Sequence, residues 1–288
     1  MNSRLATVNK LLTWSTVDGP GNRLVVFLQG CNFACSACHN PYTIGICDHC
    51  GDCIDVCEPG ALAMQDGRIA FDPELCTDCD DCLTACPISA SPMTRQMRVD
   101  DILDIARQNS AFLSGITVSG GEATLQLKFV QDLFTAIAAD KDLCHLTRFI
   151  DTNGHLGPKG WSKLLPVTDG VMLDIKGFDP ALHKRLTGKK GDKALHSALL
   201  LHQAGKLYEL RYLLSPGQTD GPDEIAALQA FAASLGDDIR IRLNAFQHHG
   251  VRGEALNWPT MQRDGVEKIA AQLREAGVAQ VITPALYQ

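Results

Sequence analysis

The amino-acid sequence predicts an α/β fold built on a parallel β-sheet. Short apolar runs rich in β-branched residues recur along the chain, and segments of helical length, with apolar residues at a period of about 3.6, lie between them. Parallel strands need crossover connections of this length, whereas antiparallel strands do not. The alternation therefore favours a parallel sheet, either open and doubly wound or closed into a barrel, and the periodicity does not distinguish the two.

Seven apolar runs are expected to be strands that are buried on both faces. They are Arg23–Leu28, Gly115–Ser119, Leu146–Ile150, Gly170–Asp174, Glu209–Leu214, Ile239–Leu243 and Gln280–Ile282. Six segments between them carry the helical period. They are Val99–Gln108, Leu125–Ala139, Trp161–Leu165, Lys193–Ala204, Asp223–Leu235 and Met261–Ala276.

Length and composition limit the class of protein. The chain has 288 residues, of which 45% are apolar and 20% charged; this suffices for one large domain or two modest ones and excludes a disordered or collagen-like chain. No apolar run reaches the roughly 18 residues that a membrane-spanning helix needs, and Met1–Lys10 does not resemble a secretion signal. We therefore expect a cytoplasmic protein with no membrane partner.

Residues 43–96 interrupt the alternation and are expected to form an inserted subdomain. Asp66-Gly67 predicts a hairpin turn inside it, and prolines and glycines mark its ends. Residues 1–42 and 97–288 then remain as one barrel-sized domain. Ten acidic residues against two basic ones between residues 47 and 96 give this part a charge of −8 and the rest about +1. No basic stripe remains for a nucleic-acid partner.

Eleven of the twelve cysteines lie between Cys31 and Cys86, and only Cys144 lies outside this stretch. This content is lower than that of small disulfide-stapled chains, and a cytoplasmic compartment keeps thiols reduced. The clustering therefore indicates metal ligands rather than a disulfide scaffold. Cys144, at the expected start of a strand, is expected to be a small buried hydrophobic residue.

Two four-cysteine runs in the insertion predict two [4Fe–4S] clusters. Each run has the Cys-x-x-Cys-x-x-Cys-x-x-x-Cys spacing of bacterial ferredoxins, in which the fourth cysteine of one run binds the cluster of the other. Zinc, which also binds Cys-x-x-Cys pairs, is the alternative. The expected ligands are Cys47, Cys50, Cys53 and Cys86 for one cluster, and Cys76, Cys79, Cys82 and Cys57 for the other.

A different cysteine group follows the first expected strand. Cys31-x-x-x-Cys35-x-x-Cys38 supplies three thiolates, which hold three corners of a four-iron cube and leave the fourth iron open to a substrate. In the alternative interpretation, His39 is a fourth ligand that closes the cube and makes it structural.

The three-cysteine motif resembles the signature of radical S-adenosylmethionine (SAM) enzymes, in which SAM chelates the open iron. The surrounding residues, Asp18-Gly-Pro-Gly-Asn-Arg-Leu-Val-Val-Phe-Leu-Gln-Gly-Cys31 and Cys38-His-Asn-Pro41, are similar to those of the activating enzymes of glycyl radical enzymes. With the two-cluster insertion, the resemblance covers nearly the whole chain and is closest to the YjjW-type activases. It implies a partial (β/α)6 TIM-like radical SAM barrel with an inserted ferredoxin-like two-[4Fe–4S] subdomain, and sites at the carboxyl ends of the strands.

The resemblance also implies a set of site residues. Gly120-Gly121-Glu122 is similar to the element that receives the SAM amino group, and two further strand-end motifs match, Asp151-Thr152-Asn153 and Asp174-Ile175-Lys176. Two carboxylates at adjacent strand ends repel each other unless a cation or an ammonium group lies between them. The resemblance implies sodium or potassium, bound by Asp151, Thr152, the Met172 carbonyl and Asp174; in the alternative interpretation, the two carboxylates are ordinary strand-end caps. With Cys31, Cys35 and Cys38 as the catalytic cluster ligands, the implied SAM contacts are Ala37, Cys38, His39, Gly120, Gly121, Glu122, Asp151, Thr152, Asn153, Asp174, Lys176 and Gln247.

Two positions depart from the family pattern. Ala37 stands where many members have an aromatic residue, so the adenine is expected to pack against the backbone or elsewhere. Gln247 stands where a related activase has a SAM-contacting histidine, and that contact is carried over to Gln247. The neighbouring His248 and His249 either reach the site or lie at a loop tip.

The resemblance implies an activase that reductively cleaves SAM to a 5′-deoxyadenosyl radical, which removes a hydrogen atom from a glycine of a partner glycyl radical enzyme. A radical SAM enzyme acting on a small molecule is the alternative, and a simple electron-transfer ferredoxin leaves most of the chain unexplained. The implied cofactors are SAM and three [4Fe–4S] clusters. The two accessory clusters either relay electrons from a flavodoxin or ferredoxin, or are structural.

Overall fold

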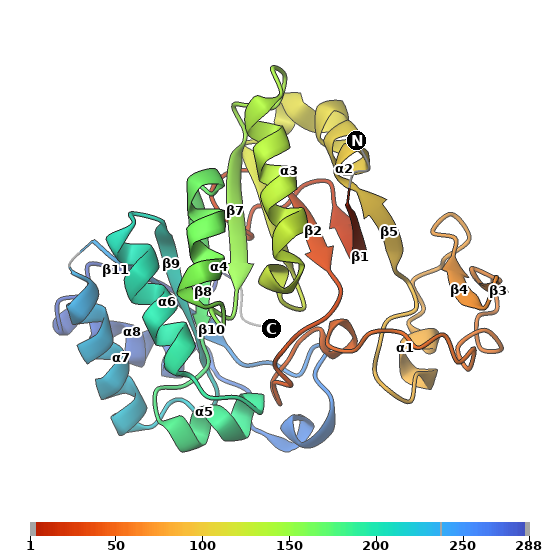
Figure 1. Cartoon of the computed structure of the whole chain (residues 1–288). Helices are drawn as coiled ribbons and strands as arrows, with labels where there is room; N and C mark the ends of the chain where they lie inside the picture. Colours follow the sequence, from red (N-terminus) through yellow and green to blue (C-terminus); the bar gives the residue numbers. More distant parts are fainter. Residues whose placement is uncertain (1–3, 237, 286–288) are drawn as a thin grey trace. The chain divides into compact units, whose positions relative to one another are not determined.

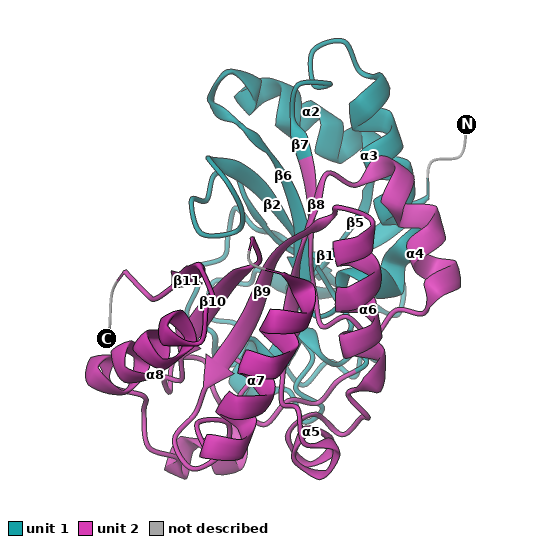
Figure 2. Ribbon diagram, turned by 90° about the vertical axis from the view of Figure 1, so that its left-hand side faces the viewer, with its two compact units in different colours: residues 1–32, 40–147 teal, residues 33–39, 148–288 magenta. Residues whose placement is uncertain are grey.

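The computed structural model describes residues 4–236 and 238–285, and the chain divides into two compact units (Figure 1, Figure 2). The first unit comprises residues 1–32 and 40–147, and the second comprises residues 33–39 and 148–288. Cys31 therefore belongs to the first unit, whereas Cys35 and Cys38, which lie in the loop 33–39, belong to the second.

Four paired strands form the sheet of the first unit. β2 (Arg23–Leu28) pairs in parallel with β6 (Gly115–Gly120), while β1 (Leu5–Leu12) runs antiparallel to both β2 and β5 (Arg95–Arg98). β2 and β6 are buried along almost their whole length because they carry apolar residues on both faces. These two strands match the predicted runs, whereas β1 and β5 were not predicted.

Two amphipathic helices of the first unit, α2 (Val99–Asn109) and α3 (Leu127–Ala139), pack against each other. α2 begins where the Asp101 carboxylate accepts a hydrogen bond from the Arg98 N–H at 2.7 Å. A short 3-10 turn, η2 (Ser110–Phe112), follows α2, and another, η3 (Ala123–Gln126), leads into α3. Both helices confirm the predicted ranges.

The inserted residues of the first unit form a hairpin and two short helical turns (Figure 1). β3 (Leu62–Gln65) and β4 (Arg68–Phe71) pair antiparallel through Asp66 and Gly67, whose φ angles of +49° and +72° fit a type I′ turn and confirm the predicted hairpin. η1 (Pro41–Thr43) and α1 (Asp81–Ala85) complete the segment. A hydrophobic cluster within it contains Cys53, Leu62, Ile69, Cys82 and Leu83.

The second unit is a run of parallel strands with helices between them (Figure 2). Among its described residues, the longest helix has 14 residues. No described helix of the chain is both long and apolar enough to cross a membrane. The strands are β7 (Thr147–Thr152), β8 (Gly170–Ile175), β9 (Leu207–Leu214), β10 (Arg240–Ala245) and β11 (Gln280–Ile282). The helices are α4 (Pro158–Leu164), α5 (Pro180–Thr187), α6 (Asp192–Gln203), α7 (Pro222–Leu235) and α8 (Arg263–Glu275), with the 3-10 turns η4 (Leu165–Val167) and η5 (Gly253–Asn257).

The burial of β9 and β10 differs from the prediction. β8 is buried on both faces as expected, but in β10 buried apolar residues alternate with half-buried polar ones, and β9 alternates from Leu210 onward. The polar positions form one charged face, which includes Glu209, Arg211 and Arg242. The expectation that all seven strands are buried on both faces was therefore wrong for these two, and also for β11, where Gln280 is exposed.

Candidate functional site

Cys31 follows β2 on a backbone that is fixed by hydrogen bonds. Gly30 has a φ of +100°, a conformation that glycine adopts readily, and its N–H donates to Thr43 O at 2.9 Å. The Cys31 N–H donates to Ile44 O at 3.1 Å. The start of the cysteine loop is therefore held in place by the chain that follows it.

Gly120 and Gly121 allow the end of β6 to approach this same segment closely. A Cβ atom on Gly120 would lie 2.2 Å from the Leu28 backbone, and one on Gly121 would lie 2.3 Å from Gly30 O. The Gly121 N–H donates to Leu28 O at 2.9 Å. The space that a Cβ would need is thus filled by the protein's own backbone, which explains both glycines without a ligand.

Glu122, the acidic residue of the same motif, is buried and only 1% exposed. Its Oε1 atom accepts hydrogen bonds from the Thr124 N–H at 3.0 Å and the Thr124 hydroxyl at 2.6 Å. The carboxylate therefore caps η3, a structural role that the sequence did not reveal.

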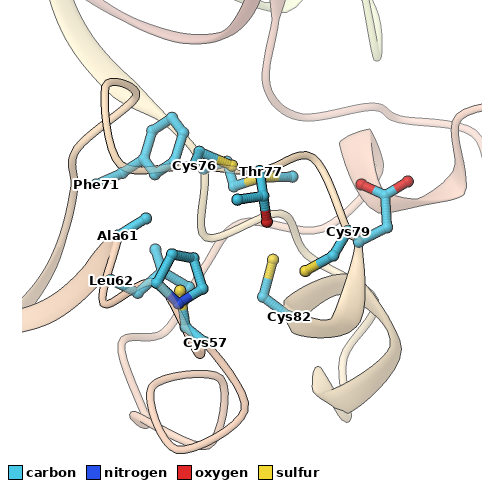
Figure 3. Close-up of a pocket in the computed structure, with 11 residues that line it drawn as sticks. Cys57, Ala61, Leu62, Phe71, Cys76, Thr77, Cys79 and Cys82 are labelled. Atoms are coloured by element: carbon cyan, nitrogen blue, oxygen red, sulfur yellow. Dashed lines mark hydrogen bonds between the residues drawn. The ribbon is translucent and has the colours of Figure 1, made fainter.

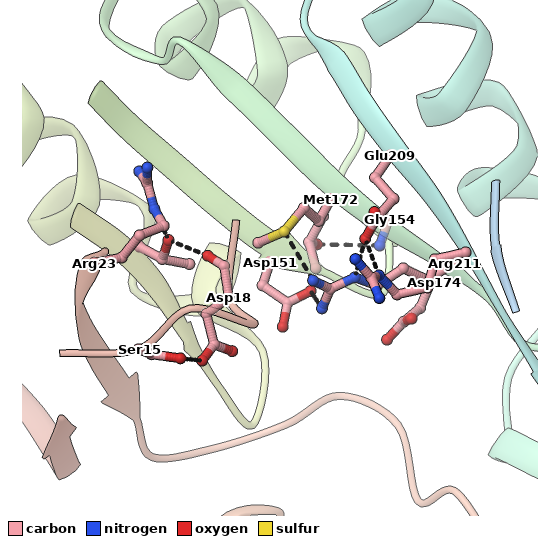
Figure 4. Close-up of polar contacts among 12 residues, drawn as sticks. Ser15, Asp18, Arg23, Asp151, Gly154, Met172, Asp174, Glu209 and Arg211 are labelled. Atoms are coloured by element: carbon pink, nitrogen blue, oxygen red, sulfur yellow. Dashed lines mark hydrogen bonds and ion pairs between the residues drawn. The ribbon is translucent and has the colours of Figure 1, made fainter. Parts of the chain in front are cut away.

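The segment before β2 is locked onto β6 through Arg23, which is fully buried (Figure 4). The guanidinium donates to Thr117 Oγ1 and to Ile116 O, both at 2.7 Å. Thr117 Oγ1 in turn donates to Asp18 O at 2.6 Å, and the Ser15 hydroxyl donates to the Asp18 carboxylate at 2.5 Å. In this structure, the Asp18–Arg23 part of the signature anchors a loop, because the buried guanidinium needs these acceptors.

In the second unit, the end of α5 holds the cysteine loop 33–39. The Ala34 and Ser36 N–H groups donate to Thr187 O and Leu186 O, both at 2.9 Å. These bonds use carbonyl groups that the last turn of a helix leaves without helical partners. They fix the backbone that carries the second and third cysteines of the motif.

A buried carboxylate fixes the other end of α5. Glu224, 7% exposed, accepts hydrogen bonds from the Phe178 N–H at 2.8 Å, the Asp179 N–H at 2.6 Å and the Tyr212 hydroxyl at 2.7 Å. Burial, followed by the hydrogen bond to Glu224, raises the pKa of Tyr212, which therefore stays protonated and continues to donate. Glu224 thus connects α7 and β9 to the segment that starts α5.

His39 provides a site for a polar ligand group. Burial lowers the pKa of its imidazole, and the positive charge of Lys176 lowers it further, so the ring is neutral. Among residues 4–236 and 238–285, its buried Nε2 atom finds no hydrogen-bond partner. This orphaned nitrogen fits the expected contact with SAM. Ala37, two residues earlier, is half-buried.

Gln247 is bound to its own chain, because its side-chain N–H donates to Met261 O at 3.1 Å. The imidazole of His248 lies 2.8 Å from Trp258 O, and both His248 and His249 are exposed. This position favours the loop-tip interpretation of the two histidines.

The carboxylates at the strand ends share a guanidinium (Figure 4). Asp151 on β7 pairs in register with Met172 on β8, two residues before Asp174. Arg211 of β9 places its Nη1 atom 3.3 Å from Asp151 Oδ1 and donates from Nη2 to Met172 Sδ at 2.9 Å. Burial opposes its charge, but Asp151, Asp174 and Glu209 outweigh this effect and raise the pKa of Arg211. A positive charge of the chain itself therefore lies against these carboxylates.

Lys176 connects these carboxylates to the cysteine loop. Its Nζ atom lies 2.9 Å from Asp174 Oδ2. Burial opposes its charge, yet the negative charge of Asp174 and, to a smaller extent, those of Cys35 and Cys38 raise the pKa of Lys176. Within the second unit, the last two motif cysteines and the strand-end charges are therefore close enough to interact.

Thr152 and Asn153 shape the turn after β7. The Thr152 hydroxyl accepts a hydrogen bond from the Gly154 N–H at 3.1 Å, and the Asn153 side chain accepts one from the His155 N–H at 3.0 Å. Both residues are buried. They position the backbone that follows Asp151.

One pocket of the insertion is ringed by cysteines (Figure 3). Its wall also contains the apolar side chains of Leu62, Phe71 and Met93. The sulfur atoms point toward a common space in Figure 3. The four cysteines are Cys57, Cys76, Cys79 and Cys82, the set that the ferredoxin spacing predicts for one cluster.

The second set of four cysteines also lies together. Burial raises the pKa of Cys53 to about 11, and the thiols whose charges add to the effect are Cys47, Cys50 and Cys86. Burial likewise raises the pKa of Cys82 to about 12. Each group thus takes its fourth cysteine from the other run.

Backbone N–H groups point at three of these sulfur atoms. His49 donates to Cys47 at 3.4 Å, and two further bonds reach Cys76 and Cys86, at 3.5 and 3.3 Å. Such bonds tune the thiolates of iron–sulfur clusters, so the donor set fits [4Fe–4S] ligation. In the described part of the chain, no three His, Cys, Asp or Glu side chains form a single-ion metal site.

Cys144 contradicts its prediction. It is exposed in the loop before β7, while the adjacent Leu143 is fully buried. The apolar residue next to the cysteine occupies the core position, and the thiol faces outward.

Comparisons with known proteins identify the family of the chain. The family model described as the radical SAM superfamily matches residues 25–228. The pyruvate formate-lyase-activating enzyme of Streptococcus mutans is 32% identical, with 84% of this chain and 78% of that protein covered. The isethionate sulfite-lyase activating enzyme of Nitratidesulfovibrio vulgaris is 31% identical, with 91% and 94% covered.

A solved structure supports the fold. The radical SAM methyltransferase from Sphaerobacter thermophilus has a TM-score of 0.59 at 13% identity, with 98% of this chain and 77% of that chain covered. At this identity the likeness concerns the fold alone. It confirms the predicted α/β class with a mostly parallel sheet.

Proposed function

Because the chain belongs to the radical SAM superfamily and, within it, to the activating enzymes of glycyl radical enzymes, we propose that it generates a glycyl radical in a separate partner enzyme. The substrate is then a glycine in a polypeptide backbone, and the reaction transfers one hydrogen atom. Loss of that atom is favourable, because the glycyl radical is delocalised between the amide nitrogen and the carbonyl group.

The residues of the second unit suit a zwitterionic ligand such as SAM. Bound to a cluster held by Cys31, Cys35 and Cys38, SAM supplies a 5′-deoxyadenosyl radical when it is reduced by one electron. Lys176 and Arg211 provide positive charge for its carboxylate, and the strand-end carboxylates provide negative charge for its ammonium group. The observations that carry the proposal are the ion pair between Lys176 and Asp174 and the buried His39 Nε2 atom of the cysteine loop, which finds no hydrogen-bond partner among the described residues.

A sodium or potassium ion bound by Asp151, Thr152, Met172 and Asp174 would share these carboxylates with Arg211 and Lys176. Since Arg211 already lies against Asp151 and Lys176 against Asp174, the charge balance does not require such an ion. Measuring SAM binding with and without sodium or potassium tests whether the ion is bound as well.

The insertion is proposed to hold two further [4Fe–4S] clusters, which makes three per chain. The grouping of Cys57 with the second run and of Cys86 with the first supports this assignment. We propose that these clusters pass electrons from a flavodoxin or ferredoxin to the SAM-binding cluster. The acidic charge of the insertion repels an equally acidic flavodoxin at low salt, which counts against direct docking of such a donor on this part of the chain.

The activase proposal is tested by incubating the anaerobically reconstituted protein with SAM, dithionite and a candidate glycyl radical enzyme. We expect an EPR doublet of a glycyl radical and an equivalent amount of 5′-deoxyadenosine. If 5′-deoxyadenosine forms while no glycyl radical enzyme encoded in the same genome acquires the doublet, the enzyme acts on another substrate.

A further inference from the structure

One face of the parallel strands of the second unit carries a row of charged side chains. Arg211 on β9 is in register with Asp174 on β8 and with Arg242 on β10. Paired residues on neighbouring strands point to the same face, and so do residues two apart on one strand. Glu209 and Arg240 therefore share this face with Arg211 and Arg242.

Glu209 is the centre of the row. It is 1% exposed and accepts hydrogen bonds from the Nε atoms of Arg211 at 2.9 Å, Arg240 at 2.8 Å and Arg242 at 2.9 Å. Arg211 also contacts Asp151, but Arg240 and Arg242 meet no carboxylate other than Glu209 among the described residues. One buried negative charge thus faces three positive ones.

The terminal Nη atoms of Arg240 and Arg242 are available to bind a ligand. Each uses only its Nε atom toward Glu209, and in the part of the chain that the structure describes neither Nη pair has a hydrogen-bond acceptor. The side chains remain 28% and 26% exposed. Arg240 is oriented further by the Tyr208 ring, whose centroid lies 5.5 Å from its guanidinium carbon.

We propose that Arg240 and Arg242 bind the carboxylate of an Asp or Glu side chain of the protein substrate, close in sequence to its target glycine. An Nη pair matches the two oxygens of a carboxylate, and Glu209 holds both guanidinium groups in place before the ligand arrives. Arg240 and Arg242 together carry one positive charge more than the Glu209 carboxylate that they share, and this surplus favours an anionic group. This inference rests on the proposed function, because it assumes that the substrate is a polypeptide.

The position of the pair on the sheet limits the spacing of the acidic residue from the glycine. Arg242 lies two strands from Asp174, a distance of about 10 Å at about 4.8 Å per strand. An extended chain covers this distance with about three residues. If the glycine is presented beside the strand-end carboxylates, the acidic residue lies about three positions from it.

The test uses blocked heptapeptides that have a central glycine and one glutamate at each other position in turn, with glutamine peptides as references. Binding to the reconstituted protein is measured by calorimetry at low salt, without SAM. We expect wild type to prefer one or two glutamate peptides by about tenfold over their glutamine counterparts. R242Q and R240Q should lose this preference, R242K should retain part of it, and R4Q, at an exposed arginine of the first unit, should keep it fully.

Three results overturn the inference: no preference for glutamate in wild type, an unchanged preference in both R240Q and R242Q, or a loss of SAM affinity without any change in peptide binding. The last result would assign the arginines to the cofactor. Production of 5′-deoxyadenosine by wild type is measured separately. Its absence contradicts the proposed function, whereas the peptide comparison alone decides the carboxylate site.

Discussion

Arg211 places its Nη1 atom 3.3 Å from Asp151 Oδ1, so a guanidinium from β9 neutralises a carboxylate that β7 presents at its carboxyl end. The same side chain reaches Glu209 with its Nε atom at 2.9 Å. One arginine therefore joins the strand-end carboxylates to the buried centre of the charged row. Removing it takes the guanidinium away from Asp151 and leaves buried Glu209 with two arginines, Arg240 and Arg242, in place of three.

Arg211→Gln should destabilise the protein by about 2–4 kcal/mol, because Asp151 and Glu209 both lose a charged donor. The measurement is urea unfolding of the apoprotein at pH 7. The exposed control, R4Q, should change the free energy of unfolding by less than about 0.5 kcal/mol. Equal stability of R211Q and wild type would mean that the guanidinium contributes nothing to the fold.

Glu209 should make stability depend on pH. Burial opposes its ionisation, but Arg211, Arg242 and Arg240 outweigh burial and lower the pKa of Glu209 below its ordinary value of 4.5. Its contribution is therefore complete above pH 4.5 and is lost as the pH falls through the lowered value. Glu209→Gln should be less stable than wild type by about 3–5 kcal/mol at pH 7, and the difference should shrink in acid. Apoprotein unfolding at several pH values measures this; a constant difference contradicts it.

The alternation of polar and apolar residues in β9 could have indicated from the sequence that Arg211 lies on a polar face of the sheet. Leu210 and Tyr212 are fully buried, while Glu209 and Arg211 share the opposite face, so the period of two was present in the sequence. The contacts of Arg211 could not be predicted, because they depend on the register that aligns it with Asp174 and places Asp151 nearby. Strand registers are set by the packing of the whole sheet.

The missed elements are short or polar. β5 (Arg95–Arg98) buries only Met97, and β1 buries only Ala6 and Val8, so neither resembles an apolar strand. α5 has eight residues, too few to display a helical period. Its boundaries were nevertheless marked, because Asp179 caps Leu182 N at 2.7 Å and Gly188 ends the helix with a φ of +76°.

Glu224 should help to hold the cysteine loop in position, because it fixes the start of α5 and the end of α5 binds the loop. Glu224→Ala removes the acceptor of two backbone N–H groups and of the Tyr212 hydroxyl, at a cost of about 2–4 kcal/mol. We expect E224A to lose iron from the three-cysteine motif to a chelator faster than wild type does. The control variant R4Q should lose it at the wild-type rate. If E224A is destabilised but retains its iron as well as wild type does, the position of α5 does not affect how firmly the cysteine loop holds its cluster.

The cysteines of the insertion should differ in reactivity when the iron is absent. Burial raises the pKa values of Cys53 and Cys82 to about 11 and about 12, so their thiols stay protonated at pH 8. Cys50 and Cys79 are exposed. Iodoacetamide should therefore modify Cys50 and Cys79 first in the apoprotein, as mass spectrometry can show. Rapid modification of Cys53 or Cys82 would contradict this burial.

The exchange of the fourth cysteine between the two runs can be tested by single substitutions. Cys86→Ala should disturb the cluster of the first run, and Cys57→Ala that of the second. Each variant should fall from about twelve irons per chain to about eight, and distinct EPR signals should disappear in the two cases. Cys144→Ala, at the exposed cysteine outside the motifs, is the control and should keep all the iron. Tight binding of two zinc ions in place of the iron would favour the zinc alternative.

Formation of 5′-deoxyadenosine from SAM tests the central claim most directly. The reconstituted wild type and Cys38→Ala are each incubated anaerobically with dithionite and SAM, and the nucleoside is quantified by chromatography. The account predicts that wild type forms 5′-deoxyadenosine and that C38A, which lacks one ligand of the three-cysteine cluster, forms none. A wild type that carries about twelve irons and forms none would show that this cluster does not cleave SAM, and the radical mechanism would be wrong.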